Sequence, residues 1–506
     1  MKKKTQRTVS ISVVLLMLLL LPVQAFAEEY NIANGNITVT AGSSGQSVSQ
    51  GSGPGVLQTT PTVITGSSDT KTVTITAETG YTAEVTLKDV NIDRSDTSDA
   101  AALLTGGDGN VNIELDGYNT LQSGNNRAGL EKGNAGTLTI GDDNDTAGSL
   151  TATSDGYGAG IGAGQGGNAS YIIITGGEIE ANGGTAGAGI GGGKGGDGSY
   201  IEISGGEVTA NGGEMGAGIG GGEWGDGHDI TITGGTVTAN GGGIGAGIGG
   251  GMYGDGSNIT ITGGTVTATG GDWAAGIGGG GSSTFNSGGV SSIPCNGYGI
   301  SITGGEVTAV GGSNGAGIGG GYEGIGSGIT VSGDAQVRVQ GGAGDASDGA
   351  GAGIGNGGNS DVPYSAYRRA IIGAEIVPDT SNLTTAGWVK YYAPGADMNK
   401  DSPMRTIGKL KVAIGMKMFI NGTAWIVAGI EGDMVELVSD DAFTEEQLKD
   451  LEALVKNLLA ESQLGKLAAD KATGERVFLA DDDIAKKYFG GEKGHIVIHA
   501  KKSILW

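Results

Sequence analysis

The sequence predicts an all-β fold, a right-handed parallel β-helix of about nine coils, and three observations carry this prediction. The isoleucine of an Ala-Gly-Ile-Gly motif recurs every 29 residues, at Ile161, Ile190, Ile219, Ile248 and Ile277. Within each repeat, three short segments alternate apolar with polar or small residues, which is the period of a strand. Glycine, 108 of 506 residues, separates these segments, and with only 8 prolines the chain is not collagen.

Stacking explains the constant repeat length. One coil cannot bury its apolar face alone, whereas stacked coils share a continuous core. Because parallel strands lie about 4.8 Å apart, equivalent residues of successive repeats become columns. The handedness follows from the general preference of parallel crossovers. Three inward columns are expected: Ile203, Ile232 and Ile261; Val208, Val237 and Val266; Ile219, Ile248 and Ile277.

The repeat sets the domain boundaries. The isoleucine series continues at Ile318 and Ile354 and, in weaker form, backwards to Leu130 and Leu104. A 12-residue excess before Ile318 is interpreted as a loop near 283–299. The predicted parts are a signal peptide (1–27), an N-terminal cap (28–70), the β-helix (71–360), a C-terminal cap or linker (361–404) and a small α+β domain (405–506).

The C-terminal domain has a different pattern from the repeats. Residues 415–439 are expected to form two or three strands. Thr444 with Gln447 resembles a capping box ahead of an apolar helical stripe, and a second helix is expected near Asp483. Cys295 is the only cysteine, so no internal disulfide is expected.

The N-terminus predicts secretion. Basic residues between Lys2 and Arg7 precede the apolar run Val13–Leu21, and Ala25-Phe26-Ala27 fits a cleavage site. No second apolar stretch of spanning length follows, so no integral membrane segment is expected in the mature chain. An extracellular protein, or one associated with the cell surface, is the expectation.

Charge and repetition argue against three partners: nucleic acid, anionic membranes and dinucleotides. The net charge is −25, which opposes binding to nucleic acid or to anionic membranes and suits cations. Gly245, Gly247 and Gly250 form a G-x-G-x-x-G motif, but more glycine and another strand follow it where a dinucleotide site needs a helix.

An aspartate column is a candidate metal site. Asp197, Asp226 and Asp255 occupy equivalent positions, and like charges in register are destabilising. Two arrangements would relieve the repulsion. The side chains would either cap backbone N–H groups of turns or share a calcium ion.

Aromatic residues near this column are candidate ligand-binding residues. Trp224 and Tyr253 follow their isoleucines by five residues and Tyr322 by four, whereas Trp273 lies on a different corner. If exposed, such rings would stack on sugar faces, with a glycan along this edge. The alternative is that they cover glycine-rich backbone.

The units "ITGGTVTANGG…GAGIGGG…GDGS", entered through "VTLKDVNI…NVNIELDGYNTL", resemble secreted carbohydrate-binding β-helix proteins of clostridia and related bacteria, whose fold is that of the pectate-lyase-like superfamily. The resemblance covers roughly residues 71–358. It implies an extracellular polysaccharide ligand, including acidic ones, and calcium.

Catalysis is the rival expectation. A lyase would need a base, for which 158–358 offers Lys194, Arg338 and His228 without a visible constellation. A hydrolase would need paired carboxylates, but Asp226 and Asp255 recur as Asp197, which repetition explains better. The expectation is a non-catalytic carbohydrate-binding or adhesin-like protein, with a polysaccharide lyase or glycoside hydrolase, or a structural spacer, as alternatives.

Overall fold

The computed structural model describes residues 28–59, 61–144, 146–282, 293–344, 349–360, 370–371, 374–376, 378–408, 417–420, 423–431, 434–439, 477–479 and 496–501. It divides into two compact units: 1–331 with 337–379 and 392–402, and 332–336 with 380–391 and 403–506. The predicted signal peptide (1–27), most of the loop near 283–299 and the helices expected after Thr444 and near Asp483 lie outside the described residues.

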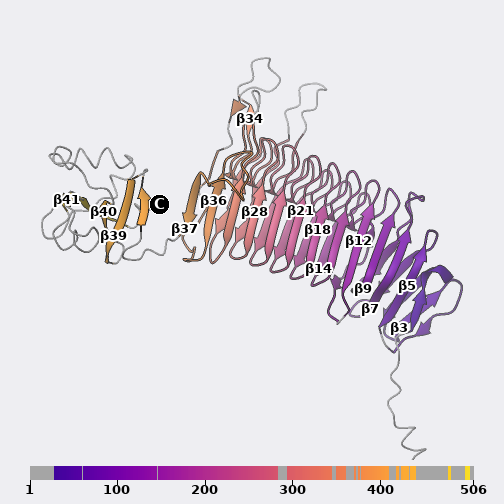
Figure 1. Ribbon diagram of the computed structural model, residues 1–506. Helices are drawn as coiled ribbons and strands as arrows, with labels where there is room; N and C mark the ends of the chain where they lie inside the picture. The colour runs from indigo at the N-terminus through magenta and orange to yellow at the C-terminus, as the bar shows by residue number, and fades with distance from the viewer. Residues whose placement is uncertain are drawn as a thin grey trace, which may run out of the picture. The chain divides into compact units, whose positions relative to one another are not determined.

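The larger unit is a stack of parallel strands (Figure 1). Each regular coil contributes three strands, which form three ladders along the stack. The first ladder consists of β2 (Ile37–Gly42), β6 (Val73–Ala77), β8 (Leu103–Gly107), β10 (Leu130–Lys132), β13 (Ile161–Gly162), β16 (Ile190–Gly191), β19 (Ile219–Gly220), β22 (Ile248–Gly249), β25 (Ile277–Gly278), β29 (Ile318–Gly319) and β33 (Ile354–Gly355). The predicted parallel β-helix is confirmed, and β6 and β2 extend this ladder beyond β8.

The second and third ladders belong to one sheet, separate from that of the first ladder. The second contains β11 (Leu138–Gly141), β14 (Ala169–Ile174), β17 (Gly198–Ile203), β20 (Gly227–Ile232), β23 (Gly256–Ile261), β26 (Gly297–Tyr298) with β27 (Ser301–Ile302), and β30 (Gly326–Ser327) with β31 (Thr330–Val331). The third contains β12 (Gly148–Ser154), β15 (Glu178–Asn182), β18 (Glu207–Asn211), β21 (Thr236–Asn240), β24 (Thr265–Thr269), β28 (Glu306–Val310) and β32 (Gln336–Gln340). In earlier coils one long strand serves both ladders: β7 (Thr82–Asp93) and β9 (Asn110–Ser123).

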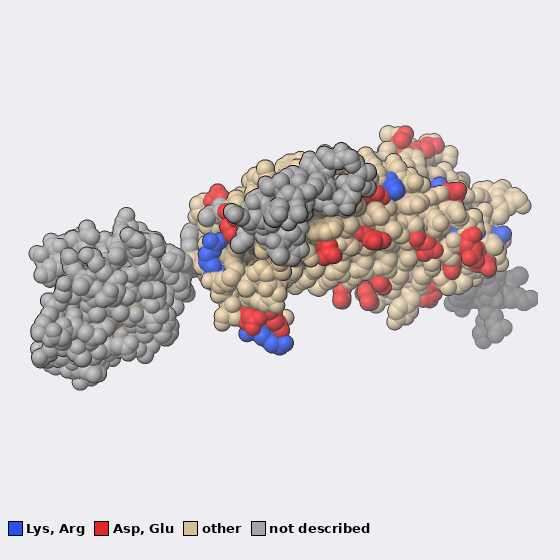
Figure 2. Space-filling view, turned by 90° about the horizontal axis from the view of Figure 1, so that it is seen from above, with Lys and Arg blue, Asp and Glu red and all other residues tan. Residues whose placement is uncertain are grey.

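The core consists of the predicted inward columns. Ile232, Val237 and Ile248 are at most 1% exposed and pair with their equivalents one coil on. Burying each such side chain contributes about 1.5–3 kcal/mol as an upper bound. One register was predicted wrongly: Leu103, not Leu104, pairs with Leu130, because the early coils depart from the 29-residue period. Outside, acidic side chains outnumber basic ones along the coils (Figure 2).

Antiparallel strands extend the first ladder beyond β2. β2 pairs antiparallel with β3 (Gly45–Gln50), and β3 with β4 (Val56–Leu57). Such pairing covers strand edges that would otherwise be open to association. The short helix η1 (Ile32–Asn34) separates β1 (Glu29–Asn31) from β2, and β1 pairs with β5 (Thr62–Ser68). β34 (Asn359–Ser360) pairs antiparallel with β35 (Ala370–Ile371).

The smaller unit contains a five-stranded antiparallel sheet. Its order is β38 (Lys417–Ile420), β39 (Thr423–Glu431), β40 (Met434–Ser439), β42 (Ile496–Lys501) and β41 (Val477–Leu479). Trp425 on β39 is fully buried. β36 (Trp388–Tyr392) and β37 (Arg405–Gly408) form an antiparallel pair. The strands expected within 415–439 are therefore confirmed.

Glycine in the first ladder is required by the close approach of successive coils. Gly249 has a φ of +133°, and a Cβ there would lie 2.0 Å from the carbonyl oxygen of Gly278. Gly249→Ala should therefore lower the free energy of unfolding by at least about 2 kcal/mol, through overpacking and backbone strain. Gly195→Asn is the control, because its Cβ would meet no atom within 4 Å. Urea unfolding followed by circular dichroism measures both, and equal stability of the two variants would contradict the steric argument.

A buried lysine makes the stability depend on pH. Lys132 is 7% exposed, and its Nζ donates to the carbonyl oxygens of Asn134 (2.6 Å) and Gly136 (2.8 Å). Burial lowers its pKa to about 8, against about 10.4 in an unfolded chain. Between these values the unfolded chain holds more protons, so the unfolding free energy contributed by this group rises with pH.

Replacing this lysine should remove that rise. From pH 7.5 to 9.5 the unfolding free energy of the wild type should increase by about 2 kcal/mol relative to Lys132→Met. Comparing the two proteins cancels groups common to both, including Cys295, whose pKa burial raises to about 12. Parallel pH profiles of the two proteins in urea unfolding would show that Lys132 does not carry the effect.

Candidate functional site

One residue in the second strand of four regular coils has a left-handed backbone. These residues are Tyr171 (φ 60°), Tyr200 (φ 49°), Asp229 (φ 54°) and Asn258 (φ 50°). Glycine, asparagine and aspartate are the residues that tolerate this conformation best, and Gly299 and Gly328 continue the column. The two tyrosines are therefore exceptional in the column.

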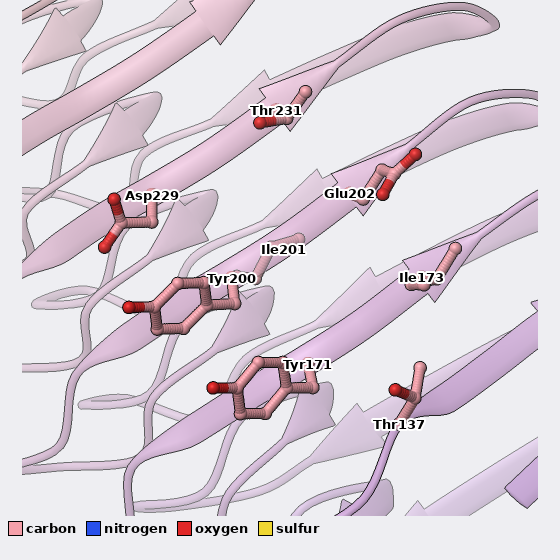
Figure 3. Close-up of a pocket in the computed structure, with 8 residues that line it drawn as sticks. All are labelled: Thr137, Tyr171, Ile173, Tyr200, Ile201, Glu202, Asp229 and Thr231. Atoms are coloured by element: carbon pink, nitrogen blue, oxygen red, sulfur yellow. The ribbon is translucent and has the colours of Figure 1, made fainter. Parts of the chain in front are cut away.

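The two tyrosine rings form an exposed pair. Their centroids are 4.9 Å apart, a distance that matches the spacing of successive coils, and the angle between the ring planes is 10°. Tyr171 is 46% exposed and Tyr200 is 49% exposed. Figure 3 shows the rings lying parallel, one beside the other along the ladder. We call this pair the tyrosine platform.

The platform borders a shallow depression of about 220 Å³. Two carboxylates line it, those of Glu202 and Asp229 (Figure 3). Asp229 continues the tyrosine column one coil on, and Glu202 lies two residues after Tyr200 on β17, in register with Thr231. The other lining residues are Thr137, Ile173, Ile201 and Thr231.

The two carboxylates differ in their partners. One oxygen of Asp229 lies 2.8 Å from Nδ1 of His228, and the other accepts a hydrogen bond of 3.4 Å from Nδ2 of Asn258. The His228 ring stands edge-on to Tyr200, with centroids 6.3 Å apart. Within the described part of the chain, Glu202 has no hydrogen bond or ion pair through its side chain. The depression therefore offers two ring faces and acceptor oxygens, which suit a ligand with C–H faces and donor groups.

Of the four aromatic residues predicted to bind a ligand, Trp224 alone is exposed, at 50%. Tyr253 is 9% exposed and Tyr322 is 2% exposed, so the prediction that their corners lie open is wrong. Trp273 is half-buried on its own corner. Tyr253 is buried because the Trp224 ring covers it, with the two ring centroids 4.1 Å apart.

The Trp224 corner is a separate aromatic cluster. Its Nε1 donates to Glu223 (3.1 Å), and Glu223 forms an ion pair with Lys194 (3.0 Å). Lys194 also lies over the Tyr157 ring, 5.1 Å from its centroid. Trp224 and Tyr253 are also left-handed, with a φ of 67° each. The polar side chains of Glu223 and Lys194 in this cluster pair with one another, however, which leaves the tyrosine platform as the better candidate for a ligand.

Sequence reasoning missed the platform although a signal was present. "SYIII" (170–174) and "SYIEI" (199–203) place two tyrosines in register one repeat apart. Aspartate and asparagine follow at the same position, so the column did not stand out as aromatic.

The predicted aspartate column is a hydrogen-bonded ladder. Oδ1 of Asp197, Asp226 and Asp255 each accepts the backbone N–H of the equivalent residue one coil on, at 2.9, 2.8 and 2.6 Å. Asn168 and Asn296 do the same on either side. No group of three His, Cys, Asp or Glu side chains placed to hold a metal occurs among the described residues. The calcium hypothesis stays a prediction.

Asp226→Asn separates the two interpretations of this column. Desolvation raises the pKa of the Asp226 carboxyl, and the charges of Asp255 and Asp197 raise it further. The unfolded chain therefore loses this proton first, so the contribution of Asp226 to stability falls as pH rises above about 4. Asparagine keeps the acceptor oxygen without the charge, and the variant should be at least as stable as the wild type at pH 7.

Calorimetric melting with and without calcium completes this test. The calcium hypothesis predicts a higher melting temperature in calcium for the wild type and a smaller rise for Asp226→Asn. An unchanged wild-type melting temperature with added calcium or chelator contradicts it. A variant clearly less stable at pH 7 would contradict the capping interpretation.

Comparison with known proteins supports the fold. The family described as beta helix repeat matches residues 172–194, 201–223, 230–252, 259–281 and 300–322. With the parallel ladders, these matches identify the chain as a parallel β-helix protein. No curated protein matches the chain, and no solved structure does. In the part of the chain that is described, no helix is long and apolar enough to cross a membrane.

Proposed function

We propose that this chain is a secreted, non-catalytic β-helix protein that binds extracellular carbohydrate at the tyrosine platform. The observation that carries the proposal is that Tyr171 and Tyr200 are exposed, stacked and left-handed where other coils have aspartate, asparagine or glycine. Large rings at such positions are unfavourable for the fold and need another reason.

The energies support a role outside folding. A left-handed conformation costs a non-glycine residue about 1–2 kcal/mol. The mutual stacking of two rings returns about 0.5–1.5 kcal/mol, and rings that remain half exposed gain little from burial. Replacing both tyrosines by asparagine, the residue type of Asn258 at the equivalent position, would relieve part of this cost. Their presence therefore favours recognition of a ligand.

The chemistry of the depression fits a sugar. Pyranose rings present C–H groups that pack on aromatic faces, and their hydroxyl groups donate hydrogen bonds to carboxylates. Glu202 and Asp229 supply such acceptors beside the rings. A shallow open depression along a ladder also accommodates a polymer, whose ends need not fit inside a cavity.

A glycoside hydrolase is the second candidate, because Glu202 and Asp229 are two carboxylates in one depression. Retaining and inverting hydrolysis both use a carboxylate pair. The shallow depression does not exclude water, which weakens electrostatic stabilisation of a transition state. Release of reducing sugar by the wild type, abolished in Glu202→Gln, would establish hydrolysis in place of simple binding.

The double variant Tyr171→Asn, Tyr200→Asn tests the binding proposal. We expect at least about tenfold weaker binding to glycans, because the ring faces are lost. Its thermal stability should equal or exceed that of the wild type, because asparagine tolerates the left-handed backbone. A glycan array followed by titration calorimetry on the best ligand measures binding, and circular dichroism measures stability.

Tyr118→Ala is the matched control. Tyr118 on β9 is 82% exposed and has no ring partner among the described residues. This variant should retain wild-type affinity. Undiminished binding by the double variant, or an equal loss in Tyr118→Ala, would refute the platform as the binding site.

A further inference from the structure

The depression beside the tyrosine platform is acidic, and Asp229 there contacts His228, which is charged only when protonated. Glu202 and Asp229 line it, and no lysine or arginine is among the lining residues. The lysine and the arginine of the central coils have partners elsewhere: Lys194 pairs with Glu223, and Arg338 pairs with Glu306. The whole chain carries a net charge of −25. An anionic ligand would therefore be repelled by Glu202 and Asp229 at this site.

The acidic residues lie in the second ring-bearing coil, with Glu202 on β17, and in the next coil, with Asp229 on β20. Glu202 stands where the neighbouring coils have Ile173 and Thr231. In the coil of β23 the two equivalent positions are Asn258 and Thr260, neither aromatic nor acidic. This coincidence of rings and carboxylates within three successive coils is not explained by the repeat. It indicates that the two features serve one ligand.

Ring faces and carboxylates together favour a cation. The face of a tyrosine ring attracts an ammonium group electrostatically, and more strongly where water is excluded. A carboxylate adds Coulomb attraction and accepts an N⁺–H hydrogen bond. The Glu202 carboxylate has no partner within the described residues, so it is available for such a bond. Asp229 already contacts His228, so its carboxylate is less available to the ligand than that of Glu202.

We propose that the tyrosine platform, with Glu202 and Asp229, binds amino-sugar units that carry a free ammonium group within an extracellular glycan. This inference rests on the proposed function and specifies its ligand class. The sugar ring packs on Tyr171 or Tyr200, and the ammonium group pairs with Glu202. Uronic acid polymers, which the family resemblance suggests, are disfavoured at this site.

The test compares three oligosaccharides of equal length on the full chain: a glucosamine oligomer, its N-acetylated form and a uronic acid oligomer. Titration calorimetry at a pH where the amine is protonated should give at least about tenfold tighter binding of the glucosamine oligomer than of the N-acetylated one. Raising the pH until the amine is neutral should abolish this preference. The uronic acid oligomer should bind weakest of the three.

Glu202→Gln should remove most of the preference for the ammonium form while keeping the affinity for the N-acetylated oligomer. The matched control is Glu207→Gln, which removes the same charge from an exposed position on β18 outside the depression. It should retain the wild-type preference. An equal effect of the two variants would attribute the preference to general charge attraction and overturn the proposal.

The outcomes separate this inference from the proposed function. Equal binding of the charged and N-acetylated oligomers, lost in the double tyrosine variant, overturns the ammonium inference and leaves carbohydrate binding intact. Tightest binding of the uronic acid oligomer also overturns it. Binding of none of the three, nor of any glycan on an array, overturns both.

Discussion

The structure depends on backbone hydrogen bonds between the paired strands of successive coils. In the first ladder, Ile248 N–H donates to Gly276 and Gly250 N–H donates to Gly278, both at 3.0 Å. The glycines there leave no room for a side chain, so the coils stack at one fixed spacing. Fixed spacing makes every position of the repeat a column, inward or outward. The inward columns form the core, and the outward columns determine the surface.

This constraint separates supporting residues from specialised ones. The aspartate ladder recurs in coil after coil, and asparagine replaces aspartate at both of its ends without loss of the hydrogen bond. Such recurrence is what support of the stack requires. The tyrosine platform occupies two coils of a column whose other members are small and polar. Two exposed rings that depart from their column, against the preference of the backbone, and that border a carboxylate without a partner among the described residues are better explained by a ligand than by the fold.

The same constraint explains what the sequence could predict. The period and the alternation sufficed for the ladders of Ile232, Val237 and Ile248, because burial there follows from register alone. They did not suffice to predict which aromatic side chains at the corners are exposed. A left-handed residue turns its side chain away from the direction that alternation implies, and Tyr253 lies beneath Trp224 for a reason no spacing shows. Leu104 was misassigned because the early coils depart from the 29-residue period.

The position of the platform within the stack follows from energetics. In a solenoid, each coil is stabilised mainly by its two neighbours, so a coil at an end has half the support of a central one. The coils of β14 and β17 have β11 on one side and β20 with β23 on the other. Two left-handed tyrosines, each costing about 1–2 kcal/mol, would promote fraying of a terminal coil. Between coils that each bury several aliphatic side chains, the same cost is small against the contribution of the neighbours. A central coil is therefore where this chain can hold exposed rings rigidly enough to bind a ligand.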